Sequence, residues 1–169
     1  MYSSARSLLT VSVFFVYSLV AACSTEASGP LGGNAQLNDP PQSFKEVVIF
    51  SVNDVHGRIN NFGKVKHIID EARAKYQSVY FVSAGDLFSG NPIVDFHPEK
   101  GYPLIDLLSK SGLDVNVIGN HEFDYGQQEL AERIDQASFD FICSNVEPGS
   151  GSLPEVPDYT LIESGGVKV

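Results

Sequence analysis

Residues 119–126 carry the side chains best suited to chemistry in this sequence. The amide of Asn120, the imidazole of His121 and the carboxylate of Asp124 lie within one turn, directly after an apolar run. That run predicts a short buried strand over residues 114–118, and ligands of α/β proteins collect at the carboxyl ends of strands. An amide, an imidazole and a carboxylate at such an end indicate phosphate chemistry at a bound cation.

Two apolar runs further upstream also end in polar residues. Residues 47–52 lead into Asp54 and His56, and residues 79–83 lead into Asp86. In an extended backbone, residues two apart point to the same side, so Asp54 and His56 are expected to grip one cation. Helical patterns separate the apolar runs, and right-handed crossovers bring parallel strands to one edge. We therefore expect the polar strand ends to converge.

The converging side chains form a ligand set for divalent cations. Carboxylates of Asp54 and Asp86, the nitrogen of His56 and the amide of Asn120 suit Zn, Mn, Fe or Mg better than a thiolate-bound metal. One cation would not need two acidic strand ends and an amide. Binuclear phosphatases and nucleases use a carboxylate that bridges two cations about 3.5–4 Å apart. The sequence therefore predicts two divalent metal ions.

Each of these residues also has a simpler structural interpretation. Asp54 could cap a helix or turn, and Asp86 could form a turn after a glycine. His121 could be a hydrogen-bonded structural histidine, and Asp124 could cap the helix that follows. Three motifs in order favour the metal site over these interpretations. Two histidines lie outside the motifs and are expected to be solvated or structural: His67 and His97.

The order of the motifs resembles the calcineurin-like metallophosphatases, and within them the 5′-nucleotidase and UDP-sugar hydrolase group. The resemblance covers residues 47–146. It rests on Asp54-x-His56, on Gly85-Asp86 followed by Gly90-Asn91-Pro92, and on the extended motif of residues 119–126. It implies an α/β fold, a layered α/β/β/α metallophosphatase domain of which this sequence holds the N-terminal portion.

The resemblance also implies a role for each site residue. The implied metal ligands are Asp54, His56, Asp86 and Asn120. Asp86 would bridge both ions, and His121 and Asp124 resemble the catalytic dyad. His121 would protonate the departing alkoxide while Asp124 holds its ring in the useful tautomer. The implied activity is metal-dependent hydrolysis of 5′-nucleotides or related small phosphate esters.

Parts of the family pattern are missing from this sequence. The family's sites are completed by later histidines and by a separate nucleotide-binding domain, but the last histidine here is His121. A non-catalytic lipoprotein fragment is therefore one alternative. A cyclic-nucleotide phosphodiesterase and a sulfur-ester hydrolase are others, because leaving-group selection would lie in absent residues. The sequence stops in a hairpin pattern at residues 159–169, so a truncated domain is expected.

The amino terminus predicts export and lipidation. Residues 8–22 are apolar or small, Arg6 precedes them, and Val-Ala-Ala-Cys at positions 20–23 is typical of a bacterial lipoprotein signal. Lipidation of Cys23 would anchor the protein to a membrane of the bacterial cell envelope, facing outside the cytoplasm. A signal cut elsewhere is the alternative. The predicted division is a signal peptide at 1–22, a flexible tether at 23–44 and the metallophosphatase portion at 45–169.

Composition and periodicity complete the sequence-based predictions. The formal net charge of −10 repels nucleic-acid backbones, which disfavours a polymeric substrate without excluding small esters at bound cations. Apolar spacing predicts helices over residues 62–76, from Tyr102 and around Leu130, and a fourth strand at residues 139–142. Cys143 is expected to be a small core residue at a strand end.

Overall fold

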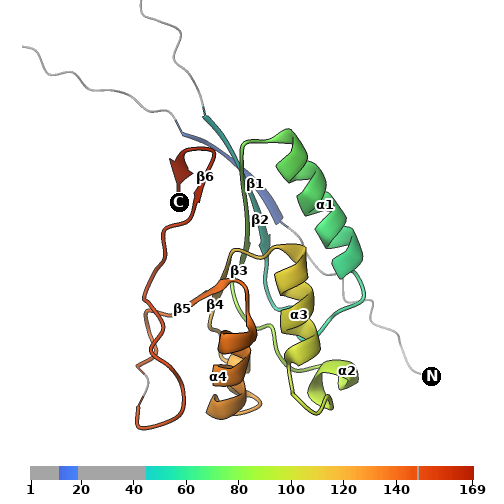
Figure 1. Ribbon diagram of the computed structural model, residues 1–169, viewed down its shortest axis with the longest axis vertical. Coiled ribbons are helices and arrows are strands. Elements are labelled where there is room, and N and C mark those ends of the chain that lie inside the picture. The colour runs from blue at the N-terminus through green and yellow to red at the C-terminus, as the bar shows by residue number, and fades with distance from the viewer. Residues whose placement is uncertain (1–11, 19–44, 148) are drawn as a thin grey trace, which may run out of the picture.

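The computed structural model describes residues 12–18, 45–147 and 149–169 (Figure 1). Most of them are organised around a five-stranded sheet of order β1-β2-β3-β4-β5. The strands are β1 Ser12–Ser18, β2 Lys45–Val52, β3 Ser78–Ser83, β4 Val115–Val117 and β5 Asp140–Ile142. β2 to β5 are parallel to one another, and β1 is antiparallel to β2. The predicted parallel α/β sheet is therefore confirmed, and the polar strand ends reach one edge.

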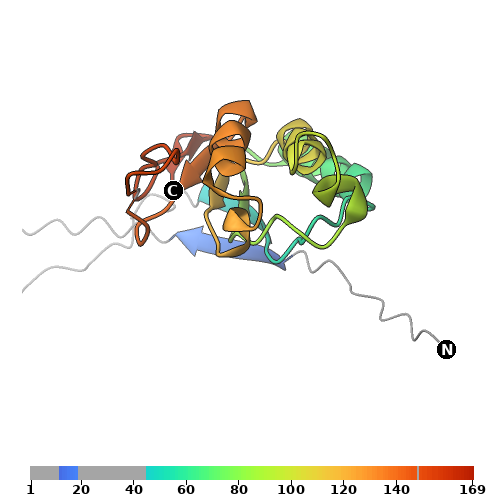
Figure 2. The same ribbon diagram turned by 90° about the horizontal axis from the view of Figure 1, so that it is seen from below.

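Three α-helices lie on one face of the sheet (Figure 2). They are α1 Phe62–Lys75, α3 Tyr102–Ser111 and α4 Gln127–Gln136, whereas α2 Pro92–Asp95 and the 3-10 turn η1 His121–Phe123 belong to the segments that follow β3 and β4. α1, α3 and α4 were predicted, whereas α2 was not. α2 begins because the Asn91 side chain accepts a hydrogen bond from the Ile93 N–H at 3.0 Å and because Pro92 has a helix-compatible φ.

The core fills the space between these helices and the sheet. Val48, Phe50 and Val52 alternate along β2 and are at most 5% exposed. Phe62 and Ile69, on the inner side of α1, belong to the same buried cluster. Each such side chain contributes about 1.5–3 kcal/mol through burial. The strands are thereby fixed up to their last residues, where the polar loops begin.

A hairpin at the carboxyl end lies on the other face of the sheet. It consists of β6 Glu163–Ser164 and β7 Val167–Lys168, which pair antiparallel as predicted. The Tyr80 hydroxyl on β3 donates to the carbonyl of Val167 at 2.6 Å and accepts from the N–H of Ser164 at 3.0 Å. The hairpin is thus bound to the first half of β3, whereas the polar loop follows the last residue of that strand.

Several predictions concern the amino-terminal segment. Cys23 and the predicted tether at 23–44 lie outside the described residues, and so do residues 1–11 and 19–22. Within the predicted signal peptide, Ser12–Ser18 forms β1 along the edge of β2. Processing of this segment stays a prediction. Among the described residues, no helix is both long and apolar enough to cross a membrane.

Cys143 follows β5 and is 3% exposed. It is a free thiol. The predicted role as a small core residue at a strand end is confirmed.

Candidate metal centre

The loops that follow β2 and β3 run side by side. The N–H of Asp54 donates to the carbonyl of Gly85, and the N–H of His56 donates to the carbonyl of Asp86, both at 3.1 Å. A third bond of this kind joins Gly57 to the second loop at 2.8 Å. The pairing of the two strands thus continues into their loops. It fixes Asp54 and His56 relative to Asp86.

The turn that follows β4 joins the other two loops through Asp86. The N–H of His121 donates to Oδ1 of Asp86 at 3.1 Å. The segments approach so closely that a Cβ on Gly119 would lie 2.4 Å from the same Oδ1 and 2.8 Å from the main-chain nitrogen of Asp86. A Cβ on Gly85 would lie 2.9 Å from the nitrogen of Gly119. Glycine is therefore required at both positions.

Three side chains from the three loops form a cluster. His56, Asp86 and His121 each offer a ligand atom, and these atoms lie within 4.8 Å of one another. The rings of His56 and His121 meet edge to face, with centroids 4.6 Å apart and an angle of 76° between their planes. All three residues are half-buried. Imidazole nitrogens beside a carboxylate are suitable ligands for Zn, Mn or Fe, so the residues fit a divalent cation.

The other two predicted ligands border this cluster. Oδ1 of Asp54 lies 3.9 Å from Nε2 of His56, and the Asp54 side chain is 59% exposed. Asn120 is exposed and, together with Asn145, lines a cavity of about 380 Å³. His121 was expected to act only in catalysis, yet it shares the cluster with His56 and Asp86. The individual ligand roles stay predictions.

The backbone of the ligand loops differs from the predicted one. Asp54 and His56 are not extended but left-handed, with φ of 49° and 46°. Asp86 and Ser89 are left-handed as well, and within the described residues these four are the only non-glycine residues with positive φ. The extended geometry used to place Asp54 and His56 was therefore wrong, because bonds to the neighbouring loop set their conformation. Strain of this kind, roughly 1–2 kcal/mol per residue, concentrates at functional sites.

His121 and Asp124 form a hydrogen-bonded pair across η1. Nδ1 of His121 lies 2.8 Å from Oδ2 of Asp124, and this bond raises the pKa of the imidazole. The Ser89 hydroxyl donates to the same Oδ2 at 2.5 Å. The bonds from Ser89 and His121 lower the pKa of Asp124. Asp124 is therefore held ionised, and Nε2 of His121 is left for a cation or substrate.

Ser89 and Tyr125 belong to the site but were not predicted. The Tyr125 hydroxyl accepts from the N–H of Ser89 at 2.9 Å and donates to the carboxylate of Asp95. Burial raises the pKa of Tyr125, so the hydroxyl keeps its proton. Tyr125 lies in the 119–126 motif, and its place in that motif could have identified it as a residue of the site. Nothing in the local sequence identified Ser89 as a site residue, because its partner Asp124 lies 35 residues further along the chain.

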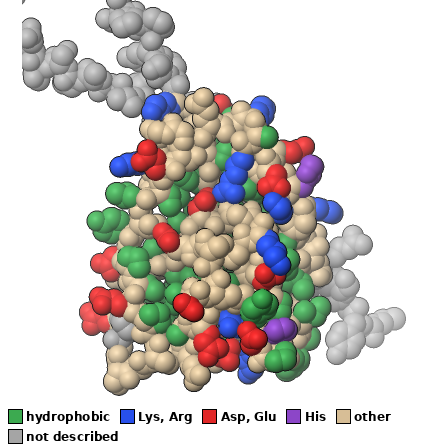
Figure 3. All heavy atoms as spheres, in the orientation of Figure 1, with side chains coloured by type: hydrophobic (Ala, Val, Ile, Leu, Met, Phe, Trp, Pro, Cys, Tyr) green, Lys and Arg blue, Asp and Glu red, His purple; other side chains and the backbone are tan. Residues whose placement is uncertain are grey.

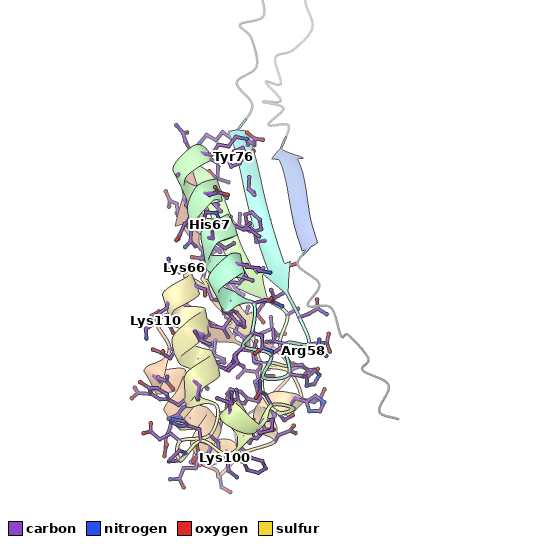
Figure 4. The ribbon with its side chains drawn as sticks, turned by 90° about the vertical axis from the view of Figure 1, so that its right-hand side faces the viewer. Arg58, Lys66, His67, Tyr76, Lys100 and Lys110 are labelled. Atoms are coloured by element: carbon purple, nitrogen blue, oxygen red, sulfur yellow. The ribbon has the colours of Figure 1, made fainter. Side chains whose placement is uncertain are left out.

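The remaining histidines lie away from the cluster, as predicted. His67 lies beside Lys66 on α1, and its side chain is 71% exposed (Figure 4). His97 stacks on Tyr102, with ring centroids 5.5 Å apart. Arg58, also labelled in Figure 4, follows the ligand loop after β2 and is half-buried.

A histidine and aspartate cluster at the carboxyl ends of parallel strands is typical of α/β domains that bind a metal ion. Residues 47–167 match the calcineurin-like phosphoesterase family model. The chain therefore belongs to the calcineurin-like phosphoesterase family, which confirms the family and the fold predicted from the motifs.

The relatives of this chain include nucleotidases, a cyclic-nucleotide phosphodiesterase and an endonuclease. The 2′,3′-cyclic-nucleotide 2′-phosphodiesterase/3′-nucleotidase of Haemophilus influenzae is 33% identical, over 75% of this chain and 22% of that protein. A 5′-nucleotidase of Vibrio cholerae is 28% identical, over 89% and 29%. Endonuclease YhcR of Bacillus subtilis is 27% identical, over 88% and 14%. The chain thus spans less than a third of each relative.

Solved structures agree with this assignment of the fold. The crystal structure of a 5′-nucleotidase precursor from Thermus thermophilus superimposes with a TM-score of 0.62 at 22% identity. The superposition covers 72% of this chain and 27% of that one. At this identity the similarity concerns the fold alone.

Proposed function

We propose that this chain is part of a metal-dependent phosphoesterase that hydrolyses 5′-nucleotides or related small phosphate esters. The observation that carries the proposal is the cluster of His56, Asp86 and His121, with Asp124 hydrogen-bonded behind His121. The names of the relatives support a nucleotide ester as the substrate.

Two divalent cations fit the ligand types of the centre. Asp54 and His56 would hold one ion, Asn120 the other, and Asp86 would contact both. When bound, such ions activate a water molecule and polarise the phosphoryl oxygens. Main-chain hydrogen bonds join the loops after β2 and β3, and the turn after β4 is joined to them through the carboxylate of Asp86, so the site is organised before any ion binds.

His121 supplies the acid for the leaving group. Its Nδ1 is engaged by Asp124, so the proton on Nε2 can pass to the departing alkoxide. The bond from phosphorus to the water oxygen forms as the bond from phosphorus to the leaving oxygen breaks. Asp124 remains ionised because Ser89 donates to it, and it stabilises the protonated ring.

The charge pattern favours a small substrate over a polymer. The formal net charge is −10. On the face shown in Figure 3, Lys and Arg side chains are scattered among Asp and Glu rather than gathered in a stripe. Binding of a nucleic-acid backbone relies on many basic contacts. Cyclic 2′,3′-nucleotides are the second candidate substrates, because a 33% identical relative bears that activity in its name.

The test is a substrate panel on the protein from which the predicted signal peptide, residues 1–22, has been removed. The metal-free protein is supplied with Mn, Zn or Mg, and product release is measured from a 5′-nucleotide, a 2′,3′-cyclic nucleotide, a UDP-sugar and single-stranded DNA. We expect metal-dependent turnover, fastest on the 5′-nucleotide. Faster turnover of the cyclic substrate would favour the second candidate. Metal binding without any turnover would favour the non-catalytic alternative.

We further propose that the protein is a lipoprotein of the bacterial cell envelope, anchored through Cys23. The apolar segment at residues 8–22 and the cysteine that follows it support this location. In a bacterial host, the wild type should fractionate with membranes, and Cys23→Ser should lose the acyl mass and the anchor. A Cys23→Ser variant that stays on the membrane and loses no acyl mass relative to the wild type would argue against lipidation.

A further inference from the structure

Glu122 is a carboxylate buried between the ligand loops. It is 0% exposed, whereas His121 and Phe123 on either side of it are half-buried. It belongs neither to the metal cluster nor to the pair formed by His121 and Asp124. Burying a carboxylate costs several kcal/mol unless hydrogen bonds replace its water. The surroundings of Glu122 must therefore supply those bonds.

Three main-chain N–H groups donate to the Glu122 carboxylate. Oε2 accepts from Gly119 at 2.6 Å and from Asp86 at 3.1 Å, and Oε1 accepts from Leu87 at 2.7 Å. Two of the donors belong to the loop after β3, and the third belongs to the turn after β4. One side chain thus binds together the two segments that present Asp86 and Asn120.

The bonds to Glu122 act on the strained part of the site. Asp86 has a φ of 56°, and its own N–H and that of Leu87 converge on one carboxylate. Consecutive N–H groups in such a turn form a concave site for an anion. Here the anion comes from the other loop of the site. Its charge-assisted hydrogen bonds offset the cost of the left-handed residue.

We propose that Glu122 is a positioning residue for the metal centre. Its carboxylate fixes the main chain at Asp86 and Gly119, and thereby the spacing between the side chains of Asp86 and Asn120. Glu122 contacts neither cation nor substrate in this role. The inference rests on the metal site of the proposed function. It predicts that metal affinity depends on a side chain that is not itself a ligand.

The test is the affinity of the intact protein for Mn²⁺, measured by calorimetry on metal-free samples. Glu122→Gln keeps the size of the side chain but sets an amide NH₂ against one main-chain N–H. We expect Mn²⁺ affinity to fall by about 10–100-fold, the usual effect of losing a group that orients a ligand. Glu122→Asp keeps the charge but shortens the reach, and it serves if the glutamine variant does not fold.

Arg133→Met is the matched control. Arg133 is 3% exposed on α4, and its bond to the carbonyl of Lys100, at 3.2 Å, lies outside the ligand loops. This change should lower the unfolding temperature and leave Mn²⁺ affinity unchanged.

The outcomes separate the inference from the proposed function. Wild-type Mn²⁺ affinity in a folded Glu122→Gln or Glu122→Asp variant would make Glu122 purely structural and overturn the inference. A wild type that binds no Mn²⁺ would overturn it too. A wild type that binds Mn²⁺ but hydrolyses no nucleotide, with weakened binding in the variants, would refute the proposed function and support the positioning role.

Discussion

At the end of the sheet that carries the C-terminal hairpin, the left-handed turn positions are occupied by glycines, Gly165 and Gly166, with φ of 59° and 71°. At the opposite end, where α2 and the ligand loops lie (Figure 1), four non-glycine residues adopt the same backbone: Asp54, His56, Asp86 and Ser89. Glycine adopts this conformation without a steric penalty, whereas other residues lose roughly 1–2 kcal/mol.

This difference in residue type distinguishes a turn that serves stability from loops that serve function. The hairpin uses the residue that its conformation prefers, and its main chain is tied to the beginning of β3 through Tyr80. The ligand loops keep side chains that the conformation disfavours, because those side chains contact one another and the neighbouring loops. Changes at the ligand loops should therefore lower activity more than stability, whereas changes at the hairpin should lower stability and leave activity unchanged.

Asp86→Ala should break the ligand end most severely. Asp86 belongs to the cluster, accepts from the N–H of His121 and is the proposed bridge between two ions. We expect both ions to be lost and turnover to fall by about 10⁴-fold, since several kcal/mol of charge stabilisation disappear. Metal analysis and kcat give the readout. Asp106→Ala on α3, where the lost carboxylate pairs with Lys110, is the control. Two retained ions with normal turnover would rule out the bridge.

His121→Ala should lower kcat by roughly 10²–10⁴-fold, the range for a positioned acid or base. Metal content should stay largely intact if the ring acts only on the leaving group. Because His121 shares the cluster with His56 and Asp86, loss of metal in proportion to activity would instead make it a ligand. The exposed His67→Ala variant on α1 provides the baseline for both measurements.

Asp124→Asn should shift the pH dependence of the reaction. Asp124 raises the pKa of His121, so the ring keeps its proton to higher pH than an isolated imidazole. A neutral amide removes this effect, so the pKa of His121 should fall. The alkaline limb of kcat, where the acid loses its proton, should then move to lower pH. Kinetics across pH and NMR titration of the His121 ring in metal-free protein test this, and an unmoved limb would assign it to another group.

Ser89→Gly and Gly165→Ala should show the smallest and most contrasting effects. Ser89→Gly removes strain and a hydrogen bond to Asp124, so stability should change by less than about 1 kcal/mol while turnover falls about tenfold. Gly165→Ala adds a Cβ that would lie 2.5 Å from Oγ of Ser78, and it should cost about 1–2 kcal/mol with turnover unchanged. Thermal unfolding and kcat distinguish them. Equal effects on activity would remove the contrast between the two ends.

Local pattern was enough to place most of the elements. Alternating or continuous apolar residues located β2, β3 and β4, and helical spacing located α1, α3 and α4, because burial of one face leaves a period in the sequence. The paired glycines located the hairpin turn, since few other residues adopt its backbone. The short α2 was missed, because four residues leave no period to detect.

The sequence by itself determined which side chains stand at the strand ends and the family to which their order belongs. Only the tertiary structure decided how these side chains meet. It gave Asp54 and His56 a left-handed backbone, brought His121 beside His56, and joined Ser89 to Asp124 and Glu122 to Asp86. The last two are hydrogen bonds between residues 35 and 36 positions apart. A periodic pattern reports which face of an element is buried, whereas the conformation of a loop depends on partners from distant loops.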